Sequence, residues 1–296
     1  MKEKFYDYGT LMKEIDGLTG EYPFLTVSSI GRSLVGREIP LIRLGYGKKS
    51  VLYVGTHHAM EWITSTLLMK YVTEVCTAVR SEGYILGHSI GELLKRRSIY
   101  VVPMLNPDGV ELQTKGCDPM NPLFDRLHRM SGGDYSRWQS NGRGVDLNHN
   151  YNAAFEQYKS LEAELGISAG ATKYSGDYPE SEPETSCLCS FMRATEISLL
   201  IALHTQGGEI YYGFNGHVPD GAEAIARKME RLCGYSLSSP EGTACYGGLK
   251  DYFTLEYDRP AFTIECGKGE NPLPLNQADS IYSVIRGVLH LCPTYI

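Results

Sequence analysis

Short apolar runs alternate with longer amphipathic segments along most of this 296-residue chain. The runs have the length of buried strands, whereas the amphipathic segments repeat apolar residues every three or four positions, as helices do. The pattern predicts strands at 24–30, 38–45, 50–54, 97–103, 198–203 and 261–264. It predicts helices at 8–20, 61–79, 183–195, 220–232 and 276–291.

The order of these elements predicts the fold class. Helices that separate successive buried strands favour an α/β fold with a mixed, mostly parallel β-sheet and helices on both of its faces. The chain has no repeat and no linker-like change of composition, so a single domain over residues 1–296 is the simplest arrangement. Residues 106–176 are rich in Gly, Asn, Asp and Tyr and show little periodicity, so we expect functional loops there.

Composition limits the classes of partner. A formal net charge of −7 offers no basic surface, so we expect no nucleic-acid partner. No apolar stretch approaches the roughly 20 residues of a membrane-spanning helix, so we expect no membrane segment. The N-terminal residues carry charge without an apolar region after them, which predicts a cytoplasmic protein; a chain trimmed from a longer precursor would act outside the cell. The 8 cysteines form no CxxC pair, and we expect reduced thiols.

Three predicted strands end in residues that can bind a metal or move a proton. His58 follows the strand at 50–54, His204 follows the strand at 198–203, and Glu265 follows the strand at 261–264. Sites in open α/β sheets form beyond the carboxyl ends of the strands, so we expect these side chains to approach one another.

His58, Glu61 and His204 make a set of two imidazoles and one carboxylate. Their spacing places His58 and Glu61 on one side of a helical turn, with Glu61 in the first turn of its helix. Such a set suits Zn²⁺ with one coordination position open to water, and we expect one Zn²⁺ per chain. Each residue alone could have an ordinary structural role, and their concentration at strand ends favours the metal site. His57 falls outside this spacing and is expected to be structural.

Glu265 requires a partner of its own. A carboxylate directly after a buried apolar strand costs free energy unless it is paired. Its partner is either a cationic side chain or a metal-activated water from which Glu265 takes a proton as general base. The second alternative predicts a zinc-dependent peptidase.

Several motifs, in this order, resemble those of the zinc carboxypeptidases related to carboxypeptidase A. The segment His58-Ala59-Met60-Glu61-Trp62 is similar to the family's H-x-x-E-W motif. Segments 106–109, 144–150, 181–184 and 262–265 also resemble family motifs. Within the family, 144–150 and 262–274 are most similar to bacterial γ-D-glutamyl-meso-diaminopimelate peptidases.

The resemblance implies roles for the matched positions. His58, Glu61 and His204 would bind zinc, and Glu265 would act as the base and later as the proton donor. Arg143 would polarise the scissile carbonyl, with Arg137 as the alternative because loop spacing varies in the family. Asp146 would orient His58, and Asn148 would bind the free carboxylate of the substrate.

Three positions bear on the substrate. His149 stands where the family's exopeptidases have arginine, which disfavours strict C-terminal trimming because histidine offers fewer donors. Thr243 stands at the position of the family's mobile tyrosine, and Tyr246 is the nearby candidate. Lys250 occupies the position that contacts the side chain beyond the cut and would favour an anionic group, with Asp251 near its amine; a solvent-exposed lysine is the alternative.

The sequence therefore predicts a zinc metallopeptidase that cuts cell-wall peptides, most specifically at a γ-D-Glu–diaminopimelate bond. Three alternatives stay open. One is a metallocarboxypeptidase that removes C-terminal residues from ordinary peptides, and another is a zinc deacylase of small N-acyl amino acids. The third is a non-catalytic domain that binds wall peptides, which the presence of Glu265 with all three metal ligands disfavours.

Overall fold

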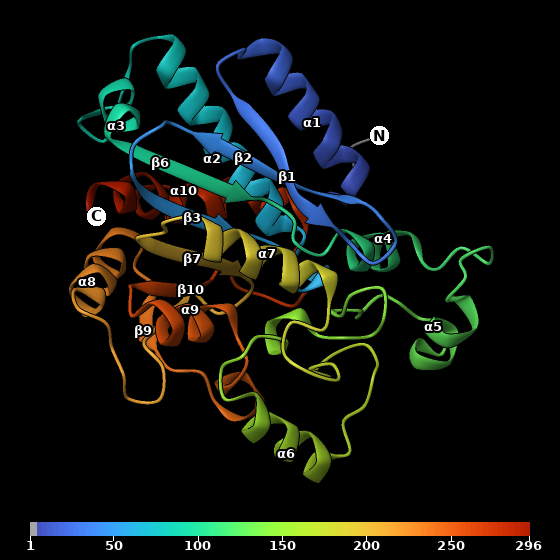
Figure 1. Cartoon of the computed structure of the whole chain (residues 1–296). Helices are drawn as coiled ribbons and strands as arrows, with labels where there is room; N and C mark the ends of the chain where they lie inside the picture. The colour runs from blue at the N-terminus through green and yellow to red at the C-terminus, as the bar shows by residue number, and fades with distance from the viewer. Residues whose placement is uncertain (1–4) are drawn as a thin grey trace.

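One eight-stranded β-sheet forms the centre of the computed structural model, which describes residues 5–296 (Figure 1). The strand order is β1-β2-β6-β3-β7-β10-β8-β9. The strands are β1 (Thr26–Arg32), β2 (Glu38–Leu44), β3 (Lys49–Val54), β6 (Arg97–Val102), β7 (Leu199–His204), β8 (Glu209–Tyr212), β9 (Ser236–Ser238) and β10 (Ala261–Glu265), with β4 (Tyr84–Ile85) and β5 (His88–Ser89) in a separate hairpin. Residues 1–4, which begin the charged N-terminal segment from which a cytoplasmic protein was expected, lie outside the described residues.

The central strands β6, β3, β7 and β10 run parallel to one another. Antiparallel pairing joins β1 to β2, β2 to β6, and β10 to β8, while β8 and β9 run parallel. The predicted mixed, mostly parallel sheet is therefore confirmed. Among the helices of residues 5–296, none has both the length and the apolar character that crossing a bilayer requires.

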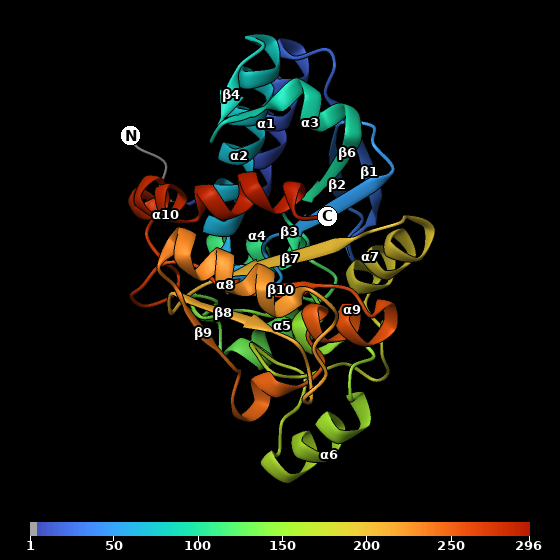
Figure 2. The same ribbon diagram turned by 90° about the vertical axis from the view of Figure 1, so that its left-hand side faces the viewer.

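Helices cover both faces because the strand side chains alternate between two apolar cores. In β3, Val51 and Tyr53 enter one core, and Leu52 and Val54 enter the other. The first core lies under α1 (Tyr8–Glu21), α2 (Ile63–Arg80), α3 (Ile90–Arg96), α8 (Ala222–Cys233) and α10 (Ala278–Leu291). The second lies under α7 (Pro183–Ala194) and α9 (Leu249–Tyr257), on the opposite face (Figure 2).

The expectation that 106–176 consists of loops was wrong in part. This span contains α4 (Pro107–Lys115), α5 (Phe124–Ser131) and α6 (Phe155–Leu165), besides a 3₁₀ turn at Leu147–His149. The helix α4 buries polar and small residues as well as apolar ones, so its sequence lacks an apolar stripe. A third, small core supports this region; its buried members are Ala59, Leu112, Leu127, Tyr135 and Trp138.

Glu61 belongs to a 3₁₀ turn (Ala59–Glu61) that precedes α2, rather than to the first turn of the helix itself. The loop before this turn is tied to α2, because the Thr56 N–H donates to Thr64 Oγ1 at 2.9 Å and the Thr56 hydroxyl pairs with Ser65 Oγ at 2.7 Å. The turn Ala59–Glu61, called the metal-binding turn below, is thus held between the loop before it and the helix after it, which are bonded to each other.

Gly55 allows this loop to leave β3 without disturbing β6. Its N–H donates to Val102 O at 2.9 Å, and its carbonyl accepts from Leu105 N at 3.1 Å. A Cβ at this position would lie 2.8 Å from the carbonyl oxygen of Pro103, which is a backbone atom that cannot move aside alone.

We predict that Gly55→Ala lowers the free energy of unfolding by about 1–3 kcal/mol, because the added methyl overpacks the join between β3 and β6. Urea unfolding measures this change. Gly17→Ala in α1 is the control, since a Cβ at Gly17 meets nothing within 4 Å, and it should instead stabilise the protein by about 0.5–1 kcal/mol. A Gly55→Ala protein as stable as wild type would contradict the prediction.

Candidate active site

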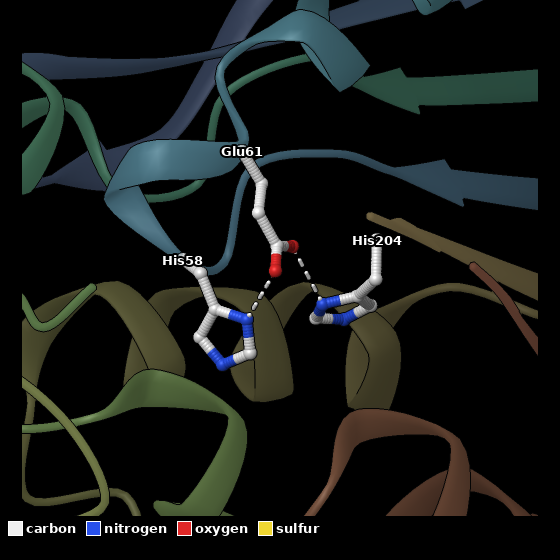
Figure 3. A group of neighbouring side chains, drawn as sticks. All are labelled: His58, Glu61 and His204. Carbon is white, nitrogen blue, oxygen red and sulfur yellow. Dashed lines mark hydrogen bonds and ion pairs between the residues drawn. The ribbon is translucent and has the colours of Figure 1, made fainter. Parts of the chain in front are cut away.

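His58, Glu61 and His204 converge at the carboxyl edge of the parallel strands (Figure 3). His58 and Glu61 come from the turn after β3, and His204 is the last residue of β7. The Nδ1 of His58 lies 3.0 Å from Glu61 Oε1, and the Nδ1 of His204 lies 3.0 Å from Glu61 Oε2. One ligand atom from each residue lies within 4.8 Å of the other two. The predicted convergence is therefore confirmed.

This donor set fits Zn²⁺, which prefers imidazole and carboxylate ligands in catalytic sites. Glu61 is 3% exposed and His204 is 1% exposed. Burial alone would raise the pKa of Glu61, but the nearby His58 and His204 outweigh it and lower this pKa to about 2. The carboxylate thus stays ionised, as a metal ligand must.

Asp146 orients the first zinc histidine. The Nε2–H of His58 donates to Asp146 Oδ1 at 3.1 Å, which leaves Nδ1 facing Glu61. Burial acts to raise the pKa of Asp146, but His58 and the backbone N–H of Lys173 hold it well below its usual range. An ionised acceptor in this position fixes the ring and increases the basicity of its metal-binding nitrogen.

His57 supports the site from behind. Its ring is stacked on that of His204 with centroids 5.3 Å apart, and its Nε2 pairs with the hydroxyl of Tyr151 at 3.0 Å. It is fully buried, so its position agrees with the structural role expected from the sequence.

Glu265 ends β10 beside the metal ligands. In the sheet it lies directly opposite His204 of β7 and opposite Glu209 of β8, so the three side chains point to the same face. Burial raises the pKa of Glu265 to about 8, and the negative charge of Glu61 adds to this effect. A divalent cation held by the neighbouring ligands acts in the other direction, because positive charge favours the carboxylate.

Arg143 and Arg137 are both paired with carboxylates other than the metal ligands. The Nε of Arg143 donates to Glu182 Oε2 at 3.0 Å, and Arg143 lines a cavity of about 80 Å³ that includes none of the metal ligands. Arg137 is paired with the exposed Glu270 at 2.7 Å. The buried carboxylate of Glu182 requires a cation, which Arg143 supplies, and the role expected of Arg143 at the carbonyl stays a prediction.

Asn148 is available to a substrate. Its Oδ1 accepts a hydrogen bond from Leu249 N at 3.1 Å, at the start of α9. Within residues 5–296, no group accepts a hydrogen bond from its Nδ2, and the side chain is partly exposed. The amide N–H groups are therefore free to bind the carboxylate of a substrate.

His149 and Tyr246 are tied to each other. The Nδ1–H of His149 donates to the backbone oxygen of Tyr246 at 2.8 Å, and the ring stacks on Tyr158 with centroids 4.2 Å apart. Burial lowers the pKa of His149, so the ring stays neutral at pH 7. A neutral, buried imidazole does not replace an arginine as a carboxylate ligand, and His149 instead positions the segment that carries Tyr246.

Lys250 is buried, so the alternative of a solvent-exposed side chain is wrong. It is 4% exposed, and its Nζ donates to Gly213 O at 2.6 Å and pairs with Asp251. Lys250 lines a cavity of about 390 Å³ together with Tyr212 and Phe214. Tyr212 of this cavity ends β8, and Glu209 at the start of the same strand lies opposite Glu265.

Three further residues around the same centre, Gln139, Thr172 and Glu209, were not predicted from the sequence. Gln139 contacts Met60 within the metal-binding turn, and Thr172 contacts both Gln139 and Asp146. Of these three, only Glu209 could have been suspected from the sequence, because it is a carboxylate a few residues after the strand that ends at His204. Glutamine and threonine carry no charge, and no motif marked them.

Comparisons with known proteins agree with this geometry. The family model described as zinc carboxypeptidase matches residues 11–282. The chain is 33% identical over 285 residues to a gamma-D-glutamyl-L-diamino acid endopeptidase 1 of Lysinibacillus sphaericus, covering 96% of this chain and 71% of that protein. It is 27% identical over 285 residues to carboxypeptidase B of Homo sapiens, covering 89% of this chain and 63% of that protein.

Solved structures share the fold. Carboxypeptidase A of Helicoverpa armigera matches with a TM-score of 0.73 and 20% identity, covering 98% of this chain and 73% of that one. A murein-tripeptide amidase of Escherichia coli O157 matches with a TM-score of 0.53 and 21% identity, covering 89% and 90%. The fold and the site together define a zinc metallopeptidase. The chain belongs to the zinc carboxypeptidase family.

We predict that His204→Ala loses bound zinc, because the site then keeps only two ligands. Metal analysis should find about one zinc per wild-type chain. At a free zinc concentration of 100 times Kd, zinc should raise the free energy of unfolding of the wild type by about 2.7 kcal/mol. Unfolding with and without a chelator measures this difference. The control His217→Ala removes an exposed imidazole that pairs with Asp258 and should leave zinc content unchanged. A wild type that binds no zinc at micromolar concentration contradicts the prediction.

Arg143→Met should lower stability by about 1–2 kcal/mol, because it leaves the buried carboxylate of Glu182 without its cation. The expected change in kcat is less than about threefold. Loss of a hydrogen-bond donor that contacts the transition state would lower kcat far more, by about 100-fold. Thermal unfolding and steady-state kinetics on one preparation separate the two effects. A fall in kcat of about 100-fold at unchanged stability would give Arg143 the role expected from the sequence.

Proposed function

We propose that this zinc metallopeptidase hydrolyses bacterial cell-wall peptides at the bond between γ-D-glutamate and diaminopimelate. The observation that carries the proposal is the buried Lys250, which lines the cavity of about 390 Å³ and is paired with Asp251. The similarity to an endopeptidase named for γ-D-glutamyl-L-diamino acid bonds supports it independently.

Lys250 lines the cavity and Asp251 is paired with it, so the two signs of charge lie next to each other. Burial raises the pKa of Asp251, and Lys250 opposes this rise, so the pair is mutually stabilised. The far end of diaminopimelate carries a carboxylate and an ammonium on one carbon. A zwitterionic group of this kind pairs its carboxylate with Lys250 and its ammonium with Asp251, which satisfies every charge in the cavity.

A lysine residue at the same place of the substrate fits less well. Its single ammonium meets Asp251 but leaves Lys250 with a like charge nearby and no new anion. Buried groups left unpaired by the wrong substrate are an effective means of discrimination. The pair therefore favours diaminopimelate over lysine.

The chain's own residues divide the chemistry. His58, Glu61 and His204 would hold the zinc, which would make water more acidic and withdraw electron density from the scissile carbonyl. Glu265 takes the proton that the water loses as its oxygen adds to the carbonyl carbon, and passes this proton to the leaving nitrogen. Asn148 donates to a carboxylate of the substrate.

Trimming of ordinary peptides from their C-termini is less well supported. A strict exopeptidase needs a strong ligand for the terminal carboxylate. His149, which stands at the family's arginine position, is buried against Tyr158 and donates to the backbone of Tyr246. Asn148 alone supplies only two neutral N–H donors. It can contact a carboxylate of the substrate, but this contact is too weak to be the main source of binding free energy.

We predict that wild type cuts L-Ala-γ-D-Glu-diaminopimelate with a kcat/KM at least about 30-fold above that for the lysine-containing peptide. In the double variant Lys250→Met/Asp251→Asn this ratio should fall below about threefold, because both charges that recognise the zwitterion are gone. Mass spectrometry of the two digests gives the bond that is cut and both rates. The double variant is preferred to Lys250→Met alone, which would leave a lone buried carboxylate.

The ratio is measured on one preparation, so any loss of folded protein cancels. Glu265→Gln is the control for contaminating activity, and it should reduce turnover of both peptides to background. Equal cleavage of both peptides by wild type, or an unchanged preference in the double variant, would overturn the proposed specificity.

A further inference from the structure

Gln139 lies beside the turn Ala59–Glu61, which carries the metal ligand Glu61. Its Nε2 lies 3.2 Å from Sδ of Met60, which stands between His58 and Glu61 in the sequence. Its backbone oxygen accepts a hydrogen bond from Ala59 N at 2.9 Å. Both the backbone and the side chain of Gln139 are therefore attached to this turn.

Thr172 fixes the orientation of the Gln139 amide. Its hydroxyl donates to Gln139 Oε1 at 2.6 Å, and the same hydroxyl oxygen lies 3.5 Å from Oδ2 of Asp146. Asp146 in turn accepts from His58. Because Thr172 occupies the carbonyl end of the amide, the NH₂ end faces the metal-binding turn.

The NH₂ group has unused donor capacity. It carries two N–H donors, and the thioether of Met60 is only a weak acceptor. Within residues 5–296, no oxygen or nitrogen accepts a hydrogen bond from this group. The side chain is partly exposed, so a ligand in the cleft can reach it. Within the part of the chain that the structure describes, Gln139 is the one residue whose side-chain N–H group contacts the side chain of Met60.

We propose that Gln139 donates a hydrogen bond to the oxygen of the scissile carbonyl, most strongly when that oxygen is negatively charged. As water adds to the carbonyl carbon, the π electron pair moves onto this oxygen and Glu265 takes the released proton. When the pair returns, the C–N bond breaks and Glu265 passes the proton to the leaving nitrogen. Gln139 exchanges no proton, and its contribution is electrostatic.

A neutral amide at Gln139 supplies a donor that does not depend on either arginine. Arg143 is held by Glu182, and Arg137 is paired with Glu270. An amide donor is weaker than a charged one but does not titrate, so its contribution is the same at every pH at which the protein is folded.

The test is the pair of variants Gln139→Met and Gln139→Arg. Gln139→Met keeps the length of the side chain and removes both donors, so kcat should fall about 100-fold. KM should stay within about threefold, because the bond strengthens mainly in the transition state. Gln139→Arg restores N–H donors and should recover kcat to within about tenfold of wild type. Zinc content and thermal stability should stay unchanged in both variants.

Binding of a phosphinic peptide analogue provides a readout apart from turnover. The phosphinate places a negatively charged oxygen where the carbonyl oxygen would be. Calorimetry should show binding to Gln139→Met that is about 100-fold weaker than to wild type, parallel to the loss in kcat. Gln113→Met is the matched control, because Gln113 is a buried glutamine that bonds Trp62 and Ser136; it should affect stability and leave kcat and analogue binding unchanged.

The comparison uses whichever defined peptide wild type hydrolyses. Failure of wild type to cut the γ-D-glutamyl bond therefore counts against the proposed substrate and not against Gln139. A Gln139→Met enzyme with kcat within about threefold of wild type would overturn the proposal. It is equally overturned if zinc content or stability falls together with kcat, or if Gln139→Arg is as slow as Gln139→Met.

Discussion

A buried carboxylate shared by two imidazoles determines the arrangement of the whole centre. Glu61 is 3% exposed, and its two oxygens face the Nδ1 atoms of His58 and His204 at 3.0 Å each. A lone carboxylate at this depth would be costly, so positive charge must stay beside it. The parallel pairing of β3 with β7 brings the two imidazoles together, and the turn after Gly55 holds the carboxylate between them.

The loop that carries Asp146 and Asn148 is held by a second group of buried acids. The Nδ2 of Asn141 donates to Glu182 and Glu184 at the start of α7. Burial raises the pKa of Glu184 to about 7, with Asp108 adding to the effect. Arg143 belongs to this network through Glu182. The loop is thus held by charged residues other than the metal ligands.

The sequence predicted most of the sheet, because buried strands are continuous apolar runs. It also predicted the three metal ligands, because imidazoles and carboxylates at the ends of separate buried strands meet at one edge of the sheet. The sequence left alternatives open where a partner distant in sequence decides the outcome. The direction of Arg143 depends on Glu182, and the burial of Lys250 depends on the carbonyl of Gly213. Gln139 was missed because a neutral amide becomes informative only when Thr172 is seen to orient it.

The fixed order of Lys250 and Asp251 has a consequence for stereochemistry. Asp251 is bonded to Lys250, whose Nζ is also held by Gly213 O, so the two charges cannot exchange places. The distal carbon of a diamino diacid carries an ammonium, a carboxylate and the chain that links it to the rest of the substrate. These three groups are held by Asp251, by Lys250 and by the direction from which the chain enters. With the hydrogen of this carbon kept on the same side, inverting the configuration would swap the two groups and bring like charges together. The same ion pair therefore favours one enantiomeric configuration at the distal carbon of a diamino diacid.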